Sequence, residues 1–568
     1  MEREVRKFIR QRKTTFASLL LFTILQISRE KMKYDEIISH LGDFGPYQRR
    51  IYLLLSFPVF CSAWHLLVQV FLAGGSDHWC AESDWANTDC PFDWNTTAAE
   101  CEEIKKYASI PVSSDGSFSK CTKYNVSGLT FDSSGYDGSA NETIACDEGW
   151  IYDRSQYKTT IITDFDLVCD RKSLPEIAQA VNFAGIMVGS FVLGILADKI
   201  GRFYTLYISI ISASLFGTLT VFSNSFWMYT ILRFFVGAAN YGCLTIAFVA
   251  ATELIGPSKR VFAGVAIQLF FALGFMALAG LGSLIRKWRY LQLTISLVPL
   301  LNLLSMPFIP ESPRWLLSQN KTTEAMKIIK KISDVNGVPL PKHDDITDDD
   351  DDVTVQYTAL DLLRRPILTV RLFTMMFVWF VHTMVYYGLA LSAADFGVNI
   401  YLSFFLAGLV ELPAYTITGF SMELIGRRLA TFILMMIGGS MCVLMPFTPL
   451  GVIRTCIAMV GKFGVSASFA LVYVWAVEIF PTPLRGNSLG LCTLASQSGG
   501  IFSPLIILLG AHWAPFPFVV FGGLTIMAGF MALLLPETKG QLMPETIADA
   551  EALGRKMRRL PLEPVEAL

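Results

Sequence analysis

Twelve segments of the sequence are long and apolar enough to cross a lipid bilayer as helices, and this feature limits the fold more than any other. A helix needs about 20 mostly apolar residues to span the hydrocarbon layer. It also satisfies its backbone hydrogen bonds internally, which the bilayer requires. The sequence therefore predicts an all-α polytopic membrane protein. The segments cover residues 51–74, 175–197, 203–222, 226–251, 261–282, 289–308, 372–394, 399–422, 430–448, 455–477, 488–510 and 515–535.

Composition supports this class and excludes several others. Only 17% of the 568 residues are charged, whereas soluble proteins carry about 25%. An aromatic content of 13% excludes disordered and fibrous proteins. The net charge of −2 lacks the basic excess of nucleic-acid-binding proteins, so we expect a lipid bilayer and no nucleic acid as partner. The sequence shows no nucleophile–base set, metal-ligand spacing or phosphate loop, so we expect no enzyme activity, cofactor or metal.

The basic residues of the short loops gather on one side of the predicted bilayer. Positive charge in short loops marks the cytosolic side, which predicts that both termini are cytosolic. One loop disagrees, because Arg286, Lys287 and Arg289 fall on the predicted outer side. The expected divisions are a cytosolic segment 1–50, a first half 51–308 that includes an outer loop 76–172, a cytosolic linker 309–371, a second half 372–535 and a cytosolic tail 536–568.

The outer loop resembles a small secreted domain in its composition. Six cysteines predict three disulfides, and their fifteen possible pairings stay open. Three Asn-x-Ser/Thr sequons, at Asn95, Asn125 and Asn141, predict N-glycosylation. Both features predict that the loop faces the outside of the cell and that the protein lies in the plasma membrane. The cysteines are Cys80, Cys90, Cys101, Cys121, Cys146 and Cys169.

An internal repeat divides the chain into two halves. Three signatures in the first half return in the second half at an offset of 225 or 226 residues. Such agreement predicts two six-helix halves in parallel repeat, an arrangement typical of transporters that rock around a site at the membrane midplane. The pairs are Gly194/Gly419, Asp198/Glu423, Gly201/Gly426, Arg202/Arg427, Glu253/Glu478, Arg260/Arg485 and Glu311/Glu537.

These signatures resemble those of a known transporter family. The Gly-x-x-x-Asp-x-x-Gly-Arg run at 194–202 is similar to that of the major facilitator superfamily, whose fold is twelve transmembrane helices in two six-helix pseudo-repeats. The cysteine-rich loop resembles solute carrier family 22, the organic cation, anion and carnitine transporters. Gly-Lys-Phe-Gly at 461–464, Glu-Ile-Phe-Pro-Thr at 478–482 and Val-Glu-Leu-Pro-Ala-Tyr at 410–415 resemble its organic cation/carnitine branch. The hydroxyl-recognition pattern of sugar porters is absent from 372–394.

The resemblance implies that the repeated acid–glycine–arginine signatures hold a cytosolic gate shut. Asp198 and Glu423 are placed to face helix N-termini of the other half, where a carboxylate is stabilised, and the arginines are placed to pair with nearby acids. The alternative is that these positive charges only fix the topology. The gating candidates are Asp198, Gly201, Arg202, Glu253, Arg260, Glu423, Gly426, Arg427, Glu478 and Arg485.

Glu411 and Lys462 are ionisable residues in the middle of predicted spans, where a charge costs about 2.5–3.5 kcal/mol on insertion scales. The resemblance places an acid and a base at these positions in the translocation cavity, and a structural ion pair is the alternative. Arg233 lies near the outer end of its span, where it can snorkel. Trp379, His382 and Tyr386 share one helical face, which suits an organic cation or ordinary packing. The further substrate-binding candidates are Tyr473, Gln268, Asn240, Tyr241 and Gln497, with Trp64 and Gln69 as weaker ones.

Gln497 departs from the pattern of the family that the chain resembles. Organic cation members carry an Asp at this position, and anion or carnitine members usually carry an Arg. The neutral amide leaves the sign of the substrate charge open. We expect a secondary transporter that moves small organic cations or carnitine-like zwitterions by alternating access, coupled to Na⁺, to the membrane potential or to neither. The alternatives are an organic anion transporter of the same fold and a non-transporting solute sensor. The oligomeric state is not predicted.

Overall fold

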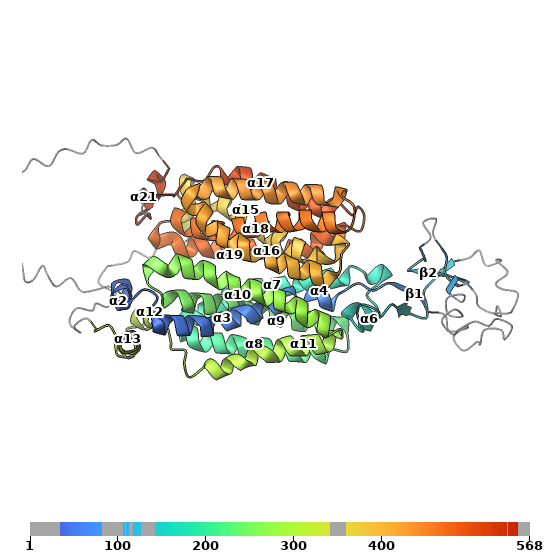
Figure 1. Ribbon diagram of the computed structural model, residues 1–568, viewed down its shortest axis with the longest axis horizontal. Coiled ribbons are helices and arrows are strands. Elements are labelled where there is room, and N and C mark those ends of the chain that lie inside the picture. The colour runs from blue at the N-terminus through green and yellow to red at the C-terminus, as the bar shows by residue number, and fades with distance from the viewer. Residues whose placement is uncertain are drawn as a thin grey trace, which may run out of the picture.

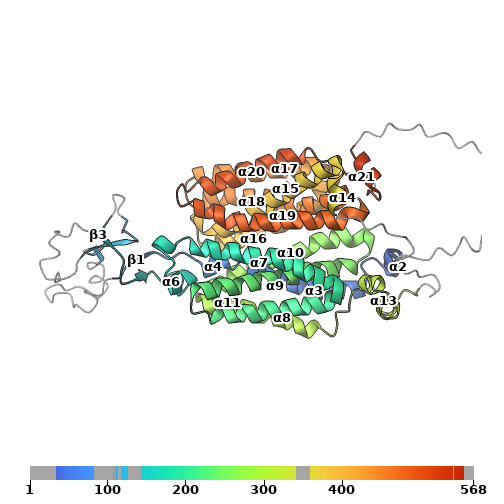
Figure 2. The same ribbon diagram turned by 180° about the vertical axis from the view of Figure 1, so that it is seen from behind.

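Two bundles of long helices lie side by side in the computed structural model of the protein (Figure 1). The structure describes residues 34–81, 106–107, 109–112, 117–125, 143–340, 359–541 and 543–554. Short strands lie at one end of the bundles, which we call the disulfide end. Short helices lie at the opposite end, which we call the basic end (Figures 1 and 2).

The first bundle is formed by the first half of the chain. Its long helices are broken only near the disulfide end, where the chain enters the strands, and near residue 298, where a 3₁₀ segment follows α11. Its helices are α3 (Pro46–Leu67), α4 (Gln69–Leu72), α6 (Ile161–Phe165), η1 (Cys169–Arg171), α7 (Leu174–Ile200), α8 (Arg202–Val221), α9 (Phe226–Glu253), α10 (Pro257–Leu284), α11 (Trp288–Leu297) and η2 (Val298–Ser305).

The second bundle repeats this pattern of long helices, and short helices flank both bundles at the basic end. The second half contains α15 (Pro366–Leu391), η4 (Ser392–Phe396), α16 (Ile400–Leu424), α17 (Arg427–Leu444), η5 (Met445–Phe447), α18 (Val452–Ile479), α19 (Thr482–Leu509) and α20 (Phe516–Ala532). The flanking helices are α2 (Tyr34–Leu41), α12 (Pro313–Ser318), α13 (Thr322–Asn336), α14 (Ala359–Leu363) and α21 (Ile547–Ala552).

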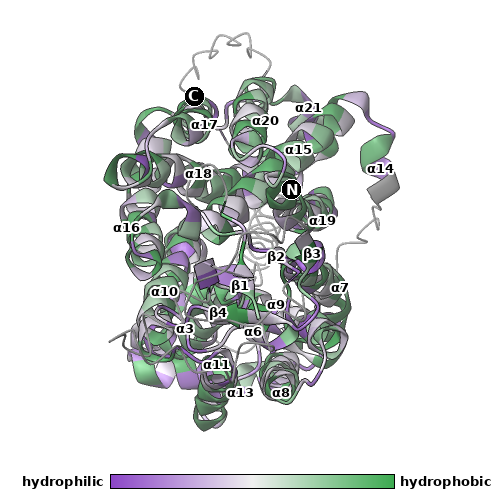
Figure 3. Cartoon of the chain, turned by 90° about the vertical axis from the view of Figure 1, so that its right-hand side faces the viewer, coloured by the Kyte–Doolittle hydropathy of each residue, from purple (hydrophilic) through white to green (hydrophobic). Residues whose placement is uncertain are grey.

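Each of the twelve predicted spans corresponds to helical structure. Among the described residues, ten helical runs are long and apolar enough to cross a membrane. The remaining two predicted spans correspond to α20, with 17 residues, and to α11 continued by η2. Figure 3, viewed along the helices, shows that most residues of the two bundles are apolar. The prediction of an all-α polytopic membrane protein is confirmed.

Many of the long helices have a proline in their first turn. Proline occupies the first turn of α3, α7, α10, α15, α19 and α20, where its missing N–H leaves no unsatisfied donor. Gly201 and Gly426 each connect two consecutive long helices, with φ of 103° and 93°. This region is open to glycine and strained for other residues, so the repeated glycines allow the sharp turns into α8 and α17.

The two halves meet along two helix pairs, α7 with α19 and α10 with α16, and Figure 2 shows α7 beside α19. These pairs interchange under the repeat, since α7 and α16 hold equivalent places in their halves, as do α10 and α19. Phe183 of α7 packs on Gly500 of α19, where an added Cβ would lie 2.9 Å from its ring. Toward the basic end, Gly194, Gly486 and Gly490 follow on the same two faces, and a Cβ added at any of them meets nothing within 4 Å. These three glycines therefore leave open space beside α7 and α19 toward the basic end.

Two short antiparallel sheets form at the disulfide end. Strand β1 (His78–Cys80) pairs with β4 (Trp150–Tyr152), and β2 (Thr122–Tyr124) pairs with β3 (Thr143–Ala145). Disulfides join Cys80 to Cys146 and Cys121 to Cys169, which confirms that disulfides form in this loop. The predicted residues Cys90, Cys101, Asn95 and Asn141 lie outside the described residues, and Asn125 follows β2.

The loop whose charges disagreed with the topology prediction is held at the disulfide end. Arg289 lies 3.3 Å from the Asp164 carboxylate, and its guanidinium donates to the Ser223 carbonyl. The Arg286 carbonyl accepts from the Lys158 N–H. The Arg289 side chain and the Arg286 backbone therefore bind the segment that follows the sheets, which accounts for the position of this loop.

Candidate functional site

A central cavity of about 120 Å³ lies between the two halves. Helices α3, α9 and α10 line it from the first half, and α15, α16, α18 and α19 line it from the second. Six of the predicted substrate-binding residues are on its wall, namely Tyr241, Gln268, Trp379, Tyr386, Tyr473 and Gln497. The residues that the sequence analysis did not select include Val59, Phe248, Phe271 and Tyr387.

Aromatic rings form most of the cavity wall. The Trp379 and Tyr473 ring centroids are 4.7 Å apart, and Phe248 of α9 reaches Tyr473 across the halves at 6.2 Å. Tyr386 stacks with Phe469 at 6.4 Å. The Trp379 side chain is 2% exposed, and its indole N–H has no hydrogen-bond partner. The wall thus combines ring faces with two buried groups that have no hydrogen-bond partner among the described residues, the Trp379 N–H and the Tyr386 hydroxyl.

Polar groups on the wall come from both halves. Gln497 lies beside the Tyr241 hydroxyl of α9, so the position that departs from the family pattern faces the opposite half. The Thr383 and Ser496 hydroxyls hydrogen-bond to each other. Gln268 of α10 supplies a second amide. These groups are neutral donors and acceptors, suited to orienting a polar solute.

Glu411 and Lys462 form a buried ion pair in the second half. The Lys462 Nζ lies 3.1 Å from Glu411 Oε1, and the side chains are 2% and 0% exposed. The ammonium also lies 3.3 Å from the centroid of the Tyr386 ring. The Tyr415 hydroxyl donates to Glu411 Oε2 at 3.2 Å. A charge pair without water is retained only where such extra contacts satisfy it.

The ion pair lies behind the cavity wall, whereas the sequence analysis expected both residues to line the cavity. Tyr386 and Tyr415 are wall residues, and each contacts one member of the pair. Lys462 also faces Phe275 of α10, 5.5 Å away, so the pair touches the first half. Two tyrosines therefore connect the cavity to the buried charges.

Two other substrate-binding candidates do not line the central cavity. Both His382 ring nitrogens have partners, the Val378 carbonyl and the Ser468 hydroxyl, each at 2.7 Å. Asn240 donates to the Ser62 carbonyl and links α9 to α3. Their helical position matched a cavity face, but local hydrogen bonds turn these side chains into the bundle.

The gating candidates form matching ion pairs at the basic end of each half. Arg202 Nη2 lies 3.2 Å from both Glu253 and Asp198, and Arg427 Nη2 lies 2.9 Å from Glu478. Residues 202 and 427, like 253 and 478, differ by 225 positions, so the repeated sequence forms a repeated contact. These pairs join helices within one half.

Glu311 and Glu537 hold the helix N-termini next to these pairs, a role that the sequence analysis missed. The Arg202 N–H donates to Glu311 Oε1, and the Arg427 N–H donates to Glu537 Oε1, each at 2.9 Å. Carboxylates are stabilised at helix N-termini. A Cβ at Gly201 would lie 2.1 Å from Glu311 Oε2, so glycine leaves room for the carboxylate. The signal was present, because both acids repeat in sequence beside the arginine signature.

The remaining gating candidates lie nearby in less similar surroundings. Arg260 pairs with Asp35 of α2 at 2.8 Å. Its repeat partner Arg485 has two guanidinium nitrogens that are buried without a hydrogen-bond partner. The Glu423 side chain is exposed, and the Asp198 side chain is 75% exposed. Neither acid therefore occupies the expected place at a helix N-terminus of the other half.

Comparison with known proteins identifies the class. Residues 135–547 match the model of the "Sugar (and other) transporter" family. A structure described as the partially occluded inward open conformation of the xylose transporter XylE from E. coli covers 87% of this chain and 99% of its own. Its TM-score is 0.57 and its sequence identity is 15%. The protein is a membrane transporter of the major facilitator superfamily and, like its family, not an enzyme.

Curated relatives give the particular family. The "Organic cation transporter protein" of Drosophila melanogaster is 36% identical over 542 residues, covering 92% of this chain and 96% of the relative. "Solute carrier family 22 member 13" of Homo sapiens is 36% identical over 526 residues, covering 91% and 93%. "Organic cation/carnitine transporter 2" of Homo sapiens is 32% identical over 545 residues, covering 93% and 96%. The chain belongs to solute carrier family 22 and resembles its organic cation and carnitine transporters.

Proposed function

We propose that the protein is a plasma-membrane secondary transporter for small organic cations or carnitine-like zwitterions. The central cavity carries this proposal. Its described lining residues are aromatic, apolar, hydroxyl-bearing or amide-bearing, and none of them is charged. A ring face attracts an ammonium group by about 0.5–2 kcal/mol, more strongly as water is excluded. A wall of several rings therefore favours a bulky organic ammonium compound over a strongly hydrated ion.

The groups around the wall favour a solute with an acceptor as well as a positive charge. Glu411 is separated from the cavity by the Tyr415 hydroxyl that donates to it, so its negative charge lies close to the wall. The free Trp379 N–H is a donor for an oxygen of the solute. A betaine carries both an ammonium group and a carboxylate, and matches these two features.

Alternating access fits an architecture of two halves that meet along two helix pairs. In transporters with two parallel halves, the halves rock around a central site. When the basic end closes, the exposed Asp198 and Glu423 and the unpartnered Arg485 nitrogens gain partners in the opposite half. We assign the disulfide end to the outside and the basic end, with both termini, to the cytosol, because basic loop residues favour the cytosolic side.

An organic anion transporter is the second candidate, and Lys462 is the observation that favours it. Its ammonium lies against the ring of Tyr386, a residue of the cavity wall. An anion that displaced this ring would meet a buried positive charge. The two candidates differ in the member of the ion pair that the solute replaces. A cation would replace Lys462 as the partner of Glu411, and an anion would replace Glu411 as the partner of Lys462.

The test is uptake of labelled tetraethylammonium, carnitine and an aromatic carboxylate into cells that express the protein, with and without Na⁺. We expect saturable uptake of tetraethylammonium or carnitine above that of cells lacking the protein. Uptake of the carboxylate alone would replace the proposal by the anion candidate. Loss of uptake when Na⁺ is removed would identify Na⁺ as the coupling ion.

A further inference from the structure

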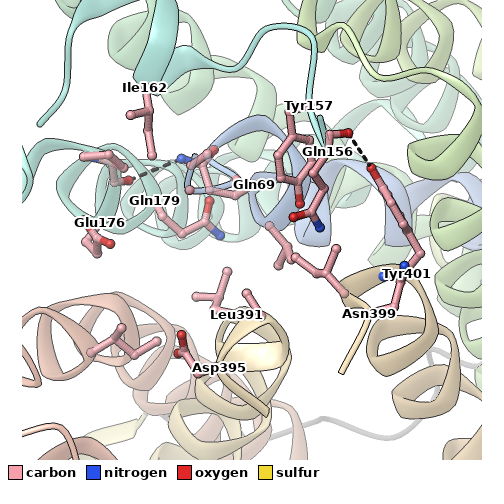
Figure 4. A pocket seen from close by; sticks show the side chains of 18 of the residues that line it. Gln69, Gln156, Tyr157, Ile162, Glu176, Gln179, Leu391, Asp395, Asn399 and Tyr401 are labelled. Atoms are coloured by element: carbon pink, nitrogen blue, oxygen red, sulfur yellow. Dashed lines mark hydrogen bonds between the residues drawn. The ribbon is translucent and has the colours of Figure 1, made fainter. Parts of the chain in front are cut away.

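A second cavity, of about 790 Å³, lies between the halves at the disulfide end (Figure 4). Gln69, Tyr157 and Glu176 line it from the first half, and Asp395 and Tyr401 line it from the second. We call it the disulfide-end cavity. It shares no described lining residue with the central cavity, so the two are separate sites.

Two carboxylates from opposite halves face this cavity. Glu176 lies in the first turn of α7, and Asp395 lies in η4. Glu176 is close enough to be repelled by the charge of Asp395, and one of its oxygens is buried without a hydrogen-bond partner. Among the described residues, neither forms an ion pair within 4.0 Å. Glu176 is half-buried and Asp395 is exposed, and two carboxylates that repel each other favour a bound cation.

The nearby basic residues have other partners. Arg286 also lines the cavity, and its guanidinium donates to the Ser155 carbonyl at 3.4 Å. Arg454 is the cation that attracts Asp395, but it does not line this cavity and donates to the Thr448 carbonyl at 3.1 Å. Among the residues that the structure describes, no guanidinium is therefore bonded to either carboxylate.

Tyr157 gives an independent sign of a ligand. Its side chain is only 5% exposed, and its hydroxyl has no hydrogen-bond partner in the described part of the chain. Figure 4 shows the hydroxyl pointing into the space between the halves. The Tyr157 ring lies 6.4 Å from that of Tyr401, so two rings and a free hydroxyl face the same space. Buried hydroxyls are normally hydrogen-bonded, which indicates a missing polar partner.

We propose that the disulfide-end cavity binds an organic ammonium group between Glu176 and Asp395, with Tyr157 as an additional contact. A cation or a betaine supplies this group. Because the two carboxylates belong to opposite halves, the bound ammonium bridges them and holds the disulfide ends together. These ends already meet where Phe71 of α4 stacks on Tyr401 of α16 at 5.6 Å. Binding therefore slows the opening of this end, so excess solute on this side inhibits uptake. This consequence rests on the transport activity proposed above.

The first test is the dependence of initial uptake rate on external tetraethylammonium concentration, with the amount of surface protein measured in parallel. We expect the wild-type rate to rise, reach a maximum and then fall. In Glu176→Gln and Asp395→Asn the inhibitory concentration should rise about tenfold or more, which corresponds to about 1.4 kcal/mol. The low-concentration half-saturation should stay unchanged, because neither residue lines the central cavity. Asp170→Asn, which removes an exposed charge near the same end, should behave as wild type.

A second measurement separates this proposal from the transport proposal. Thermal stabilisation of the purified full chain by tetraethylammonium and by carnitine reports binding without transport. We expect the Glu176→Gln/Asp395→Asn variant to lose the stabilisation seen at high solute concentration, and the two solutes to show whether a betaine also binds. Wild type without any saturable uptake would refute the proposed function. Stabilisation and uptake inhibition identical in variant and wild type would refute the disulfide-end site.

Discussion

The ion pair of Glu411 and Lys462 is the most informative place to perturb the protein. Glu411→Gln leaves the Lys462 ammonium, 2% exposed, without the carboxylate that now lies 3.1 Å away. Its remaining contacts are the Tyr386 ring, the Tyr386 carbonyl at 3.4 Å and the Phe275 ring at 5.5 Å. Removing one partner of a buried ion pair costs about 3–5 kcal/mol, whereas replacing both by apolar residues of similar volume is often neutral.

The assay compares four proteins: wild type, Glu411→Gln, Lys462→Met and the double variant Glu411→Leu/Lys462→Met. We expect both single variants to unfold at lower temperature in detergent than wild type, and the double variant to recover most of the loss. Uptake should be absent from the double variant, because the charges that transport requires are missing. Since its stability is restored, unfolding does not explain that loss. A double variant that is stable and transports at the wild-type rate would make the pair structural. Single variants as stable as wild type would refute the argument from burial.

Three further substitutions test other parts of the account. Gly201→Ala should lower the free energy of unfolding by about 1–3 kcal/mol, because φ is 103° and ψ is 163° and the added Cβ meets Glu311. Gly194→Ala places its Cβ in open space and should leave the stability unchanged. Gln497→Asp should raise the ratio of tetraethylammonium to organic anion uptake, since it places a carboxylate on the cavity wall; an unchanged ratio would remove this position from charge selection. The double variant Arg427→Glu/Glu478→Arg, which exchanges the two charges, should retain more uptake than either single variant. Equal loss of uptake in the double variant and both single variants would argue against a role for this pair.

The repeat explains why so much of the fold could be predicted from the sequence. Apolar segments of membrane-spanning length are a direct consequence of the bilayer, and Gly201 and Gly426 recur because each half needs the same sharp turn. The sixth predicted span was less simple. Its second part, η2, begins at Val298 beside Pro299, and proline removes a backbone donor that a continuous α-helix requires.

The candidate site could be predicted only in part, because helical spacing identifies a face but not what packs on it. Trp379 and Tyr386 reach the central cavity, while His382 on the same helix bonds to Ser468. Gln69, a weaker candidate for the central cavity, instead lines the disulfide-end cavity. Glu176 and Asp395 meet only through the packing of the two halves, and no sequence spacing connects them.

Counterflow in proteoliposomes is the measurement that tests the central claim most directly. Vesicles containing the purified protein are loaded with unlabelled tetraethylammonium or carnitine, and labelled solute is added outside. Alternating access predicts that label accumulates transiently above its equilibrium level, and that vesicles containing the double variant at Glu411 and Lys462 accumulate none. Binding of the solute without any counterflow would contradict the account and would support a solute sensor instead.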